Sequence, residues 1–186
     1  MILYGERVQL RFLERNDAEE FLELLLKNKD YWGRYEPLRD EAYYTLEKRA
    51  IEIEENYKDA SNGRGYSWGI FIDKGNTLIG DISLYGVKPT PFSSGSVGYS
   101  IDYDQAGNGY ATEALRLVLA FAFDYAQLHR VQAGAALDNE GSIRVLEKVG
   151  FIQEGISRKN LKINGEWKDH YQYAIIDEDW QLQKEK

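Results

Sequence analysis

Two glycines directly before an apolar helix form the stretch of this sequence best suited to bind an anion. The first turn of a helix has backbone N–H groups without an internal partner and carries the positive end of the helix dipole, and glycines let an anion approach the backbone closely. We therefore expect a phosphate or pyrophosphate to bind here. The amides expected to contact it belong to Gly107, Asn108, Gly109, Tyr110, Ala111 and Thr112.

Two other phosphate-binding motifs do not fit this glycine turn. A P-loop ends in Gly-Lys followed by Ser or Thr, whereas Gly109 is followed by Tyr110. A dinucleotide-binding fingerprint has a third glycine where this chain has Thr112. A tight turn that only caps the helix fits these residues as well.

Cysteine and histidine chemistry is limited by composition. The chain has no cysteine, which excludes a disulfide scaffold, a thiolate metal site and a cysteine nucleophile. Its two histidines, His129 and His170, are too few for a histidine metal cluster. We expect no metal.

The charge balance bears on the partners of the protein. A net charge of -8 and a pI near 4.9 argue against nonspecific nucleic-acid binding. The acidity favours a cationic partner, or it only keeps the protein in solution. The first ten residues lack a signal-peptide core, and no apolar run approaches a membrane span, so we expect a cytoplasmic protein without a membrane contact.

Hydrophobic periodicity predicts one strand and two helices at the start of the chain. Residues 7–13 alternate apolar and polar side chains, as in a strand. A first helix follows from Asn16 or Asp17, and after an aromatic loop at residues 31–40 a second helix begins at Thr45. Its expected apolar stripe comprises Leu46, Ala50, Ile53 and Tyr57.

Three strands and the apolar helix are predicted next. Tyr66–Ile72 and residues 77–85 are typical of a hairpin, and Ser94–Ile101 of a third antiparallel strand. Gly98 inside that third strand predicts a bulge or a close approach of another backbone. The following helix is apolar on nearly all sides over residues 115–123, so we expect other elements to cover it on more than one side.

The rest of the chain predicts a strand, a short helix and a long hairpin. The strand spans residues 130–137, and Asn139 caps a helix that Gly150 ends. Residues 151–163 and 167–176 form long strands joined by Asn164-Gly165. The order βααβββαβαββ predicts an α/β fold in which helices cover both faces of a mixed sheet, and the absence of a linker predicts one domain over residues 1–186.

Short motifs along the chain follow the order found in a known enzyme family. Residues 98–114 (GYSIDYDQAGNGYATEA) and 138–151 (DNEGSIRVLEKVGF), with Glu154-Gly155, resemble the GCN5-related N-acetyltransferase (GNAT) superfamily. Residues 31–41 (YWGRYEPLRDE) and 161–180 (LKINGEWKDHYQYAIIDEDW) resemble its RimJ/RimL-type ribosomal-protein-alanine N-acetyltransferase branch. The resemblance covers nearly the whole chain.

This resemblance implies a fold, a co-substrate and a set of site residues. The GNAT fold has a central, mixed, mostly antiparallel, twisted sheet of about seven strands, and the co-substrate is acetyl-CoA. Backbone groups of Tyr99, Ser100 and Ile101 are expected to pair with the pantetheine arm. The other implied cofactor contacts are Asn139, Ser142 and Lys148, besides residues 107–112. The expected substrate-binding residues are Trp32, Tyr35 and Tyr85, of which Trp32 and Tyr35 would otherwise only anchor their loop.

Direct acetyl transfer to an amine sets three chemical requirements. The amine must be neutral, the oxyanion needs a donor, and the departing thiolate needs a proton. By resemblance the backbone N–H groups of residues 99–101 polarise the carbonyl, and the catalytic residues are Ser142, which protonates the thiolate, and Asn139. Asn139 is also compatible with a plain helix cap.

The chain departs from the family pattern at three positions. Leu146 stands where many members have the tyrosine acid, and Ser96 where others have a glutamate base. The base is then a water relayed to Asp81 or Asp169, or is not needed. Ala106 replaces a Gln or Arg of the phosphate turn, and Gln105 is one place away.

The predicted function is acetyl-CoA-dependent acetylation of a protein or peptide N-terminus, with a ribosomal protein as a possible acceptor. An α-amine has a pKa two to three units below that of a lysine amine, so it needs less help from a base. Two alternatives remain: a small-amine acetyltransferase for a polyamine, amino acid or drug, and a non-catalytic acetyl-CoA-binding module. The protein is expected to be a monomer or a homodimer.

Overall fold

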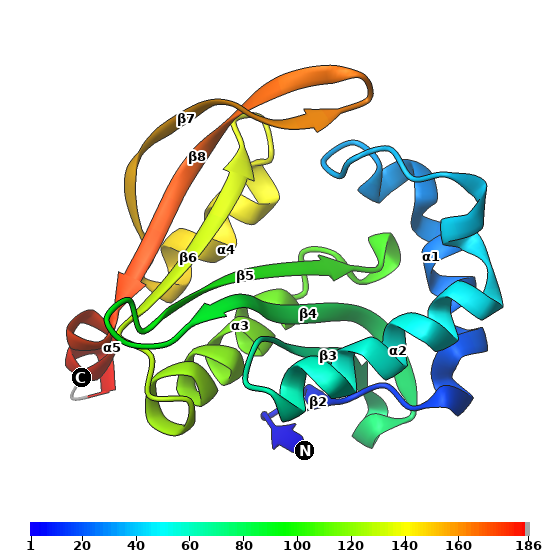
Figure 1. Ribbon diagram of the computed structural model, residues 1–186, viewed down its shortest axis with the longest axis horizontal. Coiled ribbons are helices and arrows are strands. Elements are labelled where there is room, and N and C mark those ends of the chain that lie inside the picture. Colours follow the sequence, from blue (N-terminus) through cyan, green and yellow to red (C-terminus); the bar gives the residue numbers. More distant parts are fainter. Residues whose placement is uncertain (185–186) are drawn as a thin grey trace.

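A single open sheet of eight strands forms the centre of the protein in the computed structural model, which describes residues 1–184 (Figure 1). All neighbouring strands are antiparallel except β5 and β6, which are parallel. This confirms the predicted mixed, mostly antiparallel sheet. The strands lie in the order β1 (Ile2–Tyr4), β2 (Gln9–Arg11), β3 (Tyr66–Ile72), β4 (Thr77–Lys88), β5 (Ser94–Ile101), β6 (Arg130–Ala136), β8 (Glu166–Ile176) and β7 (Ile152–Ile163).

Helices pack on both faces of the sheet. One apolar cluster joins α1 (Ala18–Trp32) and α2 (Leu46–Ser61) to Phe71 and Leu78. A larger cluster packs α3 (Tyr110–Ala120) and α4 (Glu140–Val149) against the opposite face. A π-helical turn, Phe121–Tyr125, continues α3, and α5 (Asp177–Lys184) follows β8. The predicted burial of the α3 region is confirmed, because Leu115, Val118 and Leu119 are fully buried.

Two elements at the ends of the chain were not predicted. The predicted first strand corresponds to β2, and the unpredicted β1 precedes it and pairs with it. β1 has three residues, too few for a period to stand out, and α5 is polar apart from Trp180 and Leu182. That residues 1–186 form one domain stays a prediction.

The predicted apolar stripe of α2 is wrong in part. Thr45 caps the helix as expected, because its Oγ1 accepts from the Lys48 amide at 3.3 Å. Leu46, however, is 50% exposed, whereas Arg49 is fully buried. The Arg49 guanidinium lies 4.0 Å from the centre of the Tyr43 ring and donates to the Tyr43 carbonyl at 2.9 Å. A buried arginine stacked on an aromatic ring therefore takes an inner position of the helix.

The predicted bulge at Gly98 is also wrong. Gly98 pairs with Ser83 in regular register, and the irregularity of the β4–β5 pair lies between Tyr85 and Lys88. The separation of β5 from β6 has another origin. The two strands pair only where residues 94–96 meet residues 130–132, and beyond that point they diverge (Figure 1).

Candidate active site

A large cleft opens where β5 and β6 diverge. Its volume is about 800 Å³, which suits a cofactor-sized ligand. On the β6 side, the β5 backbone from Val97 to Ile101 has no strand partner among residues 1–184. Such a free edge offers N–H and C=O groups to an extended ligand, as a neighbouring strand would.

The glycine turn lies at one end of this cleft. Gly107 has φ of 80° and Gly109 has φ of 86°, in the left-handed region that glycine enters without strain. Gly107, Gly109 and the first three residues of α3, Tyr110, Ala111 and Thr112, line the cleft. Asn108 is turned away, with its side-chain amide donating to the Gln105 carbonyl at 3.3 Å. The amides at the start of α3 therefore face a space that can take an anion.

Arg7 and Glu113, which do not line the cleft, stabilise this turn. Arg7 Nη1 donates to the Asn108 carbonyl at 2.9 Å, and Arg7 Nε lies 3.1 Å from a Glu113 carboxylate oxygen. The other oxygen of Glu113 accepts from the Arg7 and Val8 amides at 2.7 and 3.1 Å. These bonds lower the pKa of Glu113 against the opposing effect of burial. The sequence contains no signal for this contact, since it joins the segment before β2 to α3.

A pair of hydroxyl groups lies where β5 faces the start of α4. Tyr99 Oη is 3.0 Å from Ser142 Oγ and 3.3 Å from the Ser142 carbonyl oxygen. Ser142 stands in the first turn of α4, and its amide donates to Asn139 Oδ1 at 3.1 Å. Asn139 therefore caps α4 as predicted, and Asn139, Ser142 and Tyr99 all line the cleft.

The Tyr99 side chain is a feature that sequence reasoning missed. Leu146, at the position of the family tyrosine, is fully buried and belongs to the apolar core. Tyr99 brings a phenol to Ser142 from the opposite wall instead. Burial raises the pKa of Tyr99 to about 12, although the bond with Ser142 lowers it, so the phenol keeps its proton at neutral pH.

The three predicted substrate-binding residues all line the cleft. Trp32 is buried, and its Nε1 donates to the Ile101 carbonyl at 2.9 Å, so it also holds the end of β5. Tyr35 Oη donates to the Asp138 carbonyl at 3.4 Å across the cleft. Tyr85 lines the cleft and is 52% exposed. Trp32 and Tyr35 thus serve as anchors in addition to facing the site.

Basic side chains lie near the phosphate end. Lys148 lines the cleft together with Arg144, and both are exposed on α4. Gln105 and Ala106 line it as well. The side chain one place from the family position therefore still faces the site.

The predicted bases lie elsewhere. Asp81 lines a separate, smaller cavity under α2. Asp169 Oδ1 accepts from the Lys159 amide at 2.8 Å, within the β7–β8 hairpin. The carboxylate that does line the cleft is Glu36, which accepts from Ser100 Oγ at 3.3 Å, and burial raises its pKa. It lies within the segment that resembles the family, but nothing in the local pattern separates it from the other acids there.

Residues 1–184 contain neither a cluster of metal ligands nor a helix that could span a membrane. No three His, Cys, Asp or Glu side chains of that range gather closely enough to hold a metal ion. No helix within it has both the length and the apolar character required to cross a membrane.

Comparison with known proteins identifies relatives over nearly the whole chain. Residues 7–152 match the acetyltransferase (GNAT) domain family. The probable N-acetyltransferase YjcK of Bacillus subtilis (strain 168) is 41% identical over 178 residues, which are 96% of this chain and 98% of that protein. The ribosomal protein uS5-alanine N-acetyltransferase of Escherichia coli (strain K12) is 28% identical over 181 residues, 96% of this chain and 92% of that protein.

A solved structure supports the same assignment. Mycobacterium smegmatis RimJ in complex with CoA-disulfide superposes with a TM-score of 0.91 at 27% identity, covering 96% of this chain and 88% of that one. The fold of nearly the whole chain therefore agrees with the resemblance to the RimJ/RimL-type branch that was inferred from short motifs. This chain belongs to the GNAT acetyltransferase family and is an N-acetyltransferase.

Proposed function

We propose that this enzyme transfers an acetyl group directly from acetyl-CoA to the N-terminal α-amine of a protein, with a ribosomal protein in the cytoplasm as the acceptor. Two relatives support the acceptor. One is named as acting on the alanine of ribosomal protein uS5, and the other is a RimJ. RimJ was also solved with CoA-disulfide, which supports the donor.

The observation that carries the proposal is the hydroxyl pair of Tyr99 and Ser142 beside the free edge of β5. A pantetheine arm is an extended chain with amide groups, so it would bind this edge as a strand does. The start of α3 would hold the pyrophosphate, with Lys148 and Arg144 nearby. A thioester bound in this way would have its sulfur near α4.

The residues of the chain then meet the chemical requirements of transfer. Backbone N–H groups of residues 99–101 would donate to the oxygen on which negative charge develops. Ser142 would give a proton to the departing sulfur, and Tyr99 would supply the next proton through its contact with Ser142.

Two hydrogen bonds that bridge the cleft favour a narrow, extended acceptor. Asn164, at the tip of the β7–β8 hairpin, donates to the Gly33 carbonyl at 3.2 Å, and Tyr35 reaches the Asp138 carbonyl at 3.4 Å. Both bonds connect the segment after α1 to the C-terminal half of the chain (Figure 1). An extended N-terminus would pass beneath these contacts more easily than a lysine on a folded surface.

The proposal is tested by thiol release from acetyl-CoA with a panel of amines. The panel comprises ribosomal-type peptides with free Ala or Ser N-termini, the same peptides with blocked N-termini, free lysine, and spermidine. We expect release with the free peptides and none with the blocked ones, and the mass of the product should place the acetyl group on the α-amine.

Other outcomes of this panel are equally informative. Release with spermidine or lysine alone would overturn the α-amine assignment and favour a small-amine acetyltransferase. Acetyl-CoA binding without release from any amine would favour a binding module.

A further inference from the structure

Two carboxyl groups lie beside the same serine of β5, Glu36 in the cleft and Asp81 in the separate cavity under α2. Ser100 Oγ donates to Glu36 Oε1 at 3.3 Å. On β4, Asp81 stands directly opposite Ser100 in the antiparallel register. Directly opposed residues have Cβ atoms about 5 Å apart and side chains on the same face. Glu36 and Asp81 are therefore both neighbours of Ser100.

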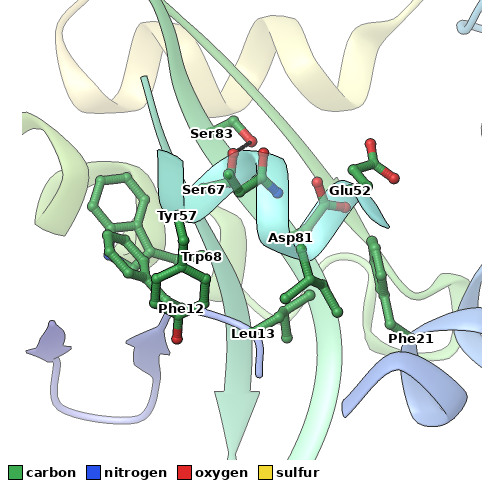
Figure 2. A pocket seen from close by; sticks show the side chains of 11 residues that line it. Phe12, Leu13, Phe21, Glu52, Tyr57, Ser67, Trp68, Asp81 and Ser83 are labelled. Atoms are coloured by element: carbon green, nitrogen blue, oxygen red, sulfur yellow. Dashed lines mark hydrogen bonds between the residues drawn. The ribbon is translucent and has the colours of Figure 1, made fainter. Parts of the chain in front are cut away.

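Asp81 faces a small cavity beneath α2 (Figure 2). The cavity has a volume of about 80 Å³, and Glu52 enters it from α2 while Ser67 and Ser83 enter from β3 and β4. Ser83 and Ser67 bond to each other at 2.9 Å.

Burial and neighbouring charges shift the pKa values of both carboxyls. Burial and the negative charges of Glu36 and Glu52 raise the pKa of Asp81 to about 7, and the charge of Arg49 opposes them. Burial also raises the pKa of Glu36, while Arg39 and the bond from Ser100 lower it. The negative charge of Glu36 is thus one of the causes that keep the proton on Asp81, because each carboxyl disfavours the ionisation of the other. A cation at Glu36 would relieve the repulsion between them.

We propose that Glu36 is the carboxylate that binds the ammonium group of the acceptor and takes its proton, with Ser100 as the positioning residue that orients it. This inference rests on the proposed acetyl transfer and assigns the amine-binding residue of that site. The ammonium gives one proton to Glu36, which returns it to solvent after turnover. The nitrogen lone pair forms the new C–N bond while the C–S bond breaks. A second nitrogen proton passes to water as the amide forms. Ser142 protonates the departing thiolate and regains a proton from solvent by way of Tyr99, so the protons balance.

The test compares Glu36→Gln with Glu41→Gln. Both remove one negative charge, but Glu41 is exposed and lies outside the residues that line the cleft. For Glu36→Gln we expect kcat/KM at pH 7 to fall by about 100-fold, the typical contribution of a general base. Affinity for acetyl-CoA should not change, and Glu41→Gln should behave as the wild type.

The pH dependence separates a base from a structural residue. An α-amine has a pKa of about 8, so at pH 9.5 it arrives neutral and needs no base. The deficit of Glu36→Gln should therefore shrink to a few-fold at that pH. A deficit that is equal at pH 7 and pH 9.5, or no deficit, would overturn the inference.

A binding measurement keeps the inference testable without turnover. Alaninamide, a cation, and N-acetylalaninamide, which is neutral, are titrated into the wild type and both variants and followed by NMR. A hydrogen bond to a charged group is worth about 1.5–3 kcal/mol, so Glu36→Gln should bind alaninamide at least about tenfold more weakly. Equal binding by the wild type and Glu36→Gln would overturn the inference.

Failure of the proposed α-amine function can be distinguished from failure of the role assigned to Glu36. If the wild type acetylates only spermidine, the α-amine assignment falls, but Glu36→Gln should still lose that activity in the same pH-dependent way. If Glu36→Gln does not fold, Glu36→Asp keeps the charge, and it must retain the preference for alaninamide over its acetylated form. Loss of that preference in a folded Glu36→Asp would count against the role of the charge.

Discussion

At the scale of single residues, we propose that the contact between Tyr99 and Ser142 takes the place of the tyrosine that many family members have at the position of Leu146 on α4. We expect Ser142→Ala and Tyr99→Phe each to lower kcat by about 100-fold or more, because general acids contribute that much. The double variant should be little worse than either single one, since the two hydroxyls act as a unit. Steady-state kinetics with a free-amine peptide measures this.

Tyr125→Phe is the matched control for Tyr99→Phe. Tyr125 is 68% exposed and lies outside the cleft lining, so its loss of a hydroxyl should leave kcat unchanged. Fully additive effects of Ser142→Ala and Tyr99→Phe would show that the two hydroxyls act separately.

The raised pKa of Asp81 leads to a prediction about how stability depends on pH. Its pKa is about 7 in the folded protein and near the ordinary value of about 4 in the unfolded chain. Between these values the folded state holds a proton that the unfolded chain has released, so stability falls as pH rises from 4 to 7. Three pKa units correspond to about 4 kcal/mol as an upper limit. Asp81→Asn should gain a few kcal/mol relative to the wild type at pH 8, and nothing at pH 4.

Urea unfolding at pH 4, 6 and 8 measures this difference. Asp30→Asn is the control, because Asp30 is exposed on α1. A constant difference between Asp81→Asn and the wild type across the three pH values would contradict the assignment of a raised pKa to Asp81.

At the scale of elements, the turns and helix caps were predicted correctly, because each depends on a few neighbouring residues. Asn164 and Gly165 both adopt positive φ, as the predicted two-residue hairpin turn requires. Thr45 and Asn139 cap their helices through their own side chains, and Gly150 ends α4 with φ of 101°. Each of these features depends on a few neighbouring residues, so it can be inferred from their types and spacing.

Contacts between distant segments could not be predicted in the same way. Glu36 meets Ser100, and Arg7 meets Asn108, only after the sheet has brought their elements together. Gly98 predicted a bulge, but the strands separate because β6 pairs with three residues of β5 and then diverges. The cleft was inferred from family resemblance, while its carboxylate and its second hydroxyl required the three-dimensional structure.

The glycine turn yields a prediction at this scale. Alanine in the left-handed region costs about 1–2 kcal/mol, so Gly107→Ala and Gly109→Ala should both destabilise the protein by about that much. A Cβ at Gly109 would also meet Arg7 Nη2 at 3.2 Å, whereas nothing lies within 4 Å of one at Gly107. Gly109→Ala should therefore lose more stability than Gly107→Ala. Thermal unfolding compares them, and equal losses would show that Arg7 moves aside freely.

At the scale of the whole molecule, the sheet consists of two parts with a narrow connection. Strands β1–β5 and β6–β8 share only three residue pairs of strand contact. A ligand bound along the free edge of β5 would add hydrogen bonds across this divide. We expect acetyl-CoA to slow amide hydrogen exchange in residues 97–101 and 133–136 more than in β3, which lies inside the first part.

Hydrogen-exchange mass spectrometry with and without acetyl-CoA tests this expectation. Desulfo-CoA serves as a control that keeps the pantetheine arm but lacks the thiol, and it should protect the same peptides. Uniform protection of all strands would indicate general stabilisation instead of a bridge between the two parts.

The cleft between β5 and β6 has a consequence for the order of events in a catalytic cycle. Its lining includes Thr112 from α3 and Lys148 from α4, and also Tyr31 from α1 and Glu36 from the segment between α1 and α2. If the donor binds along the α3 and α4 side and the acceptor at Glu36, as proposed, neither needs to leave before the other binds. Both substrates would be held together in a ternary complex, and reciprocal plots of initial rate against one substrate, at fixed levels of the other, would intersect instead of running parallel.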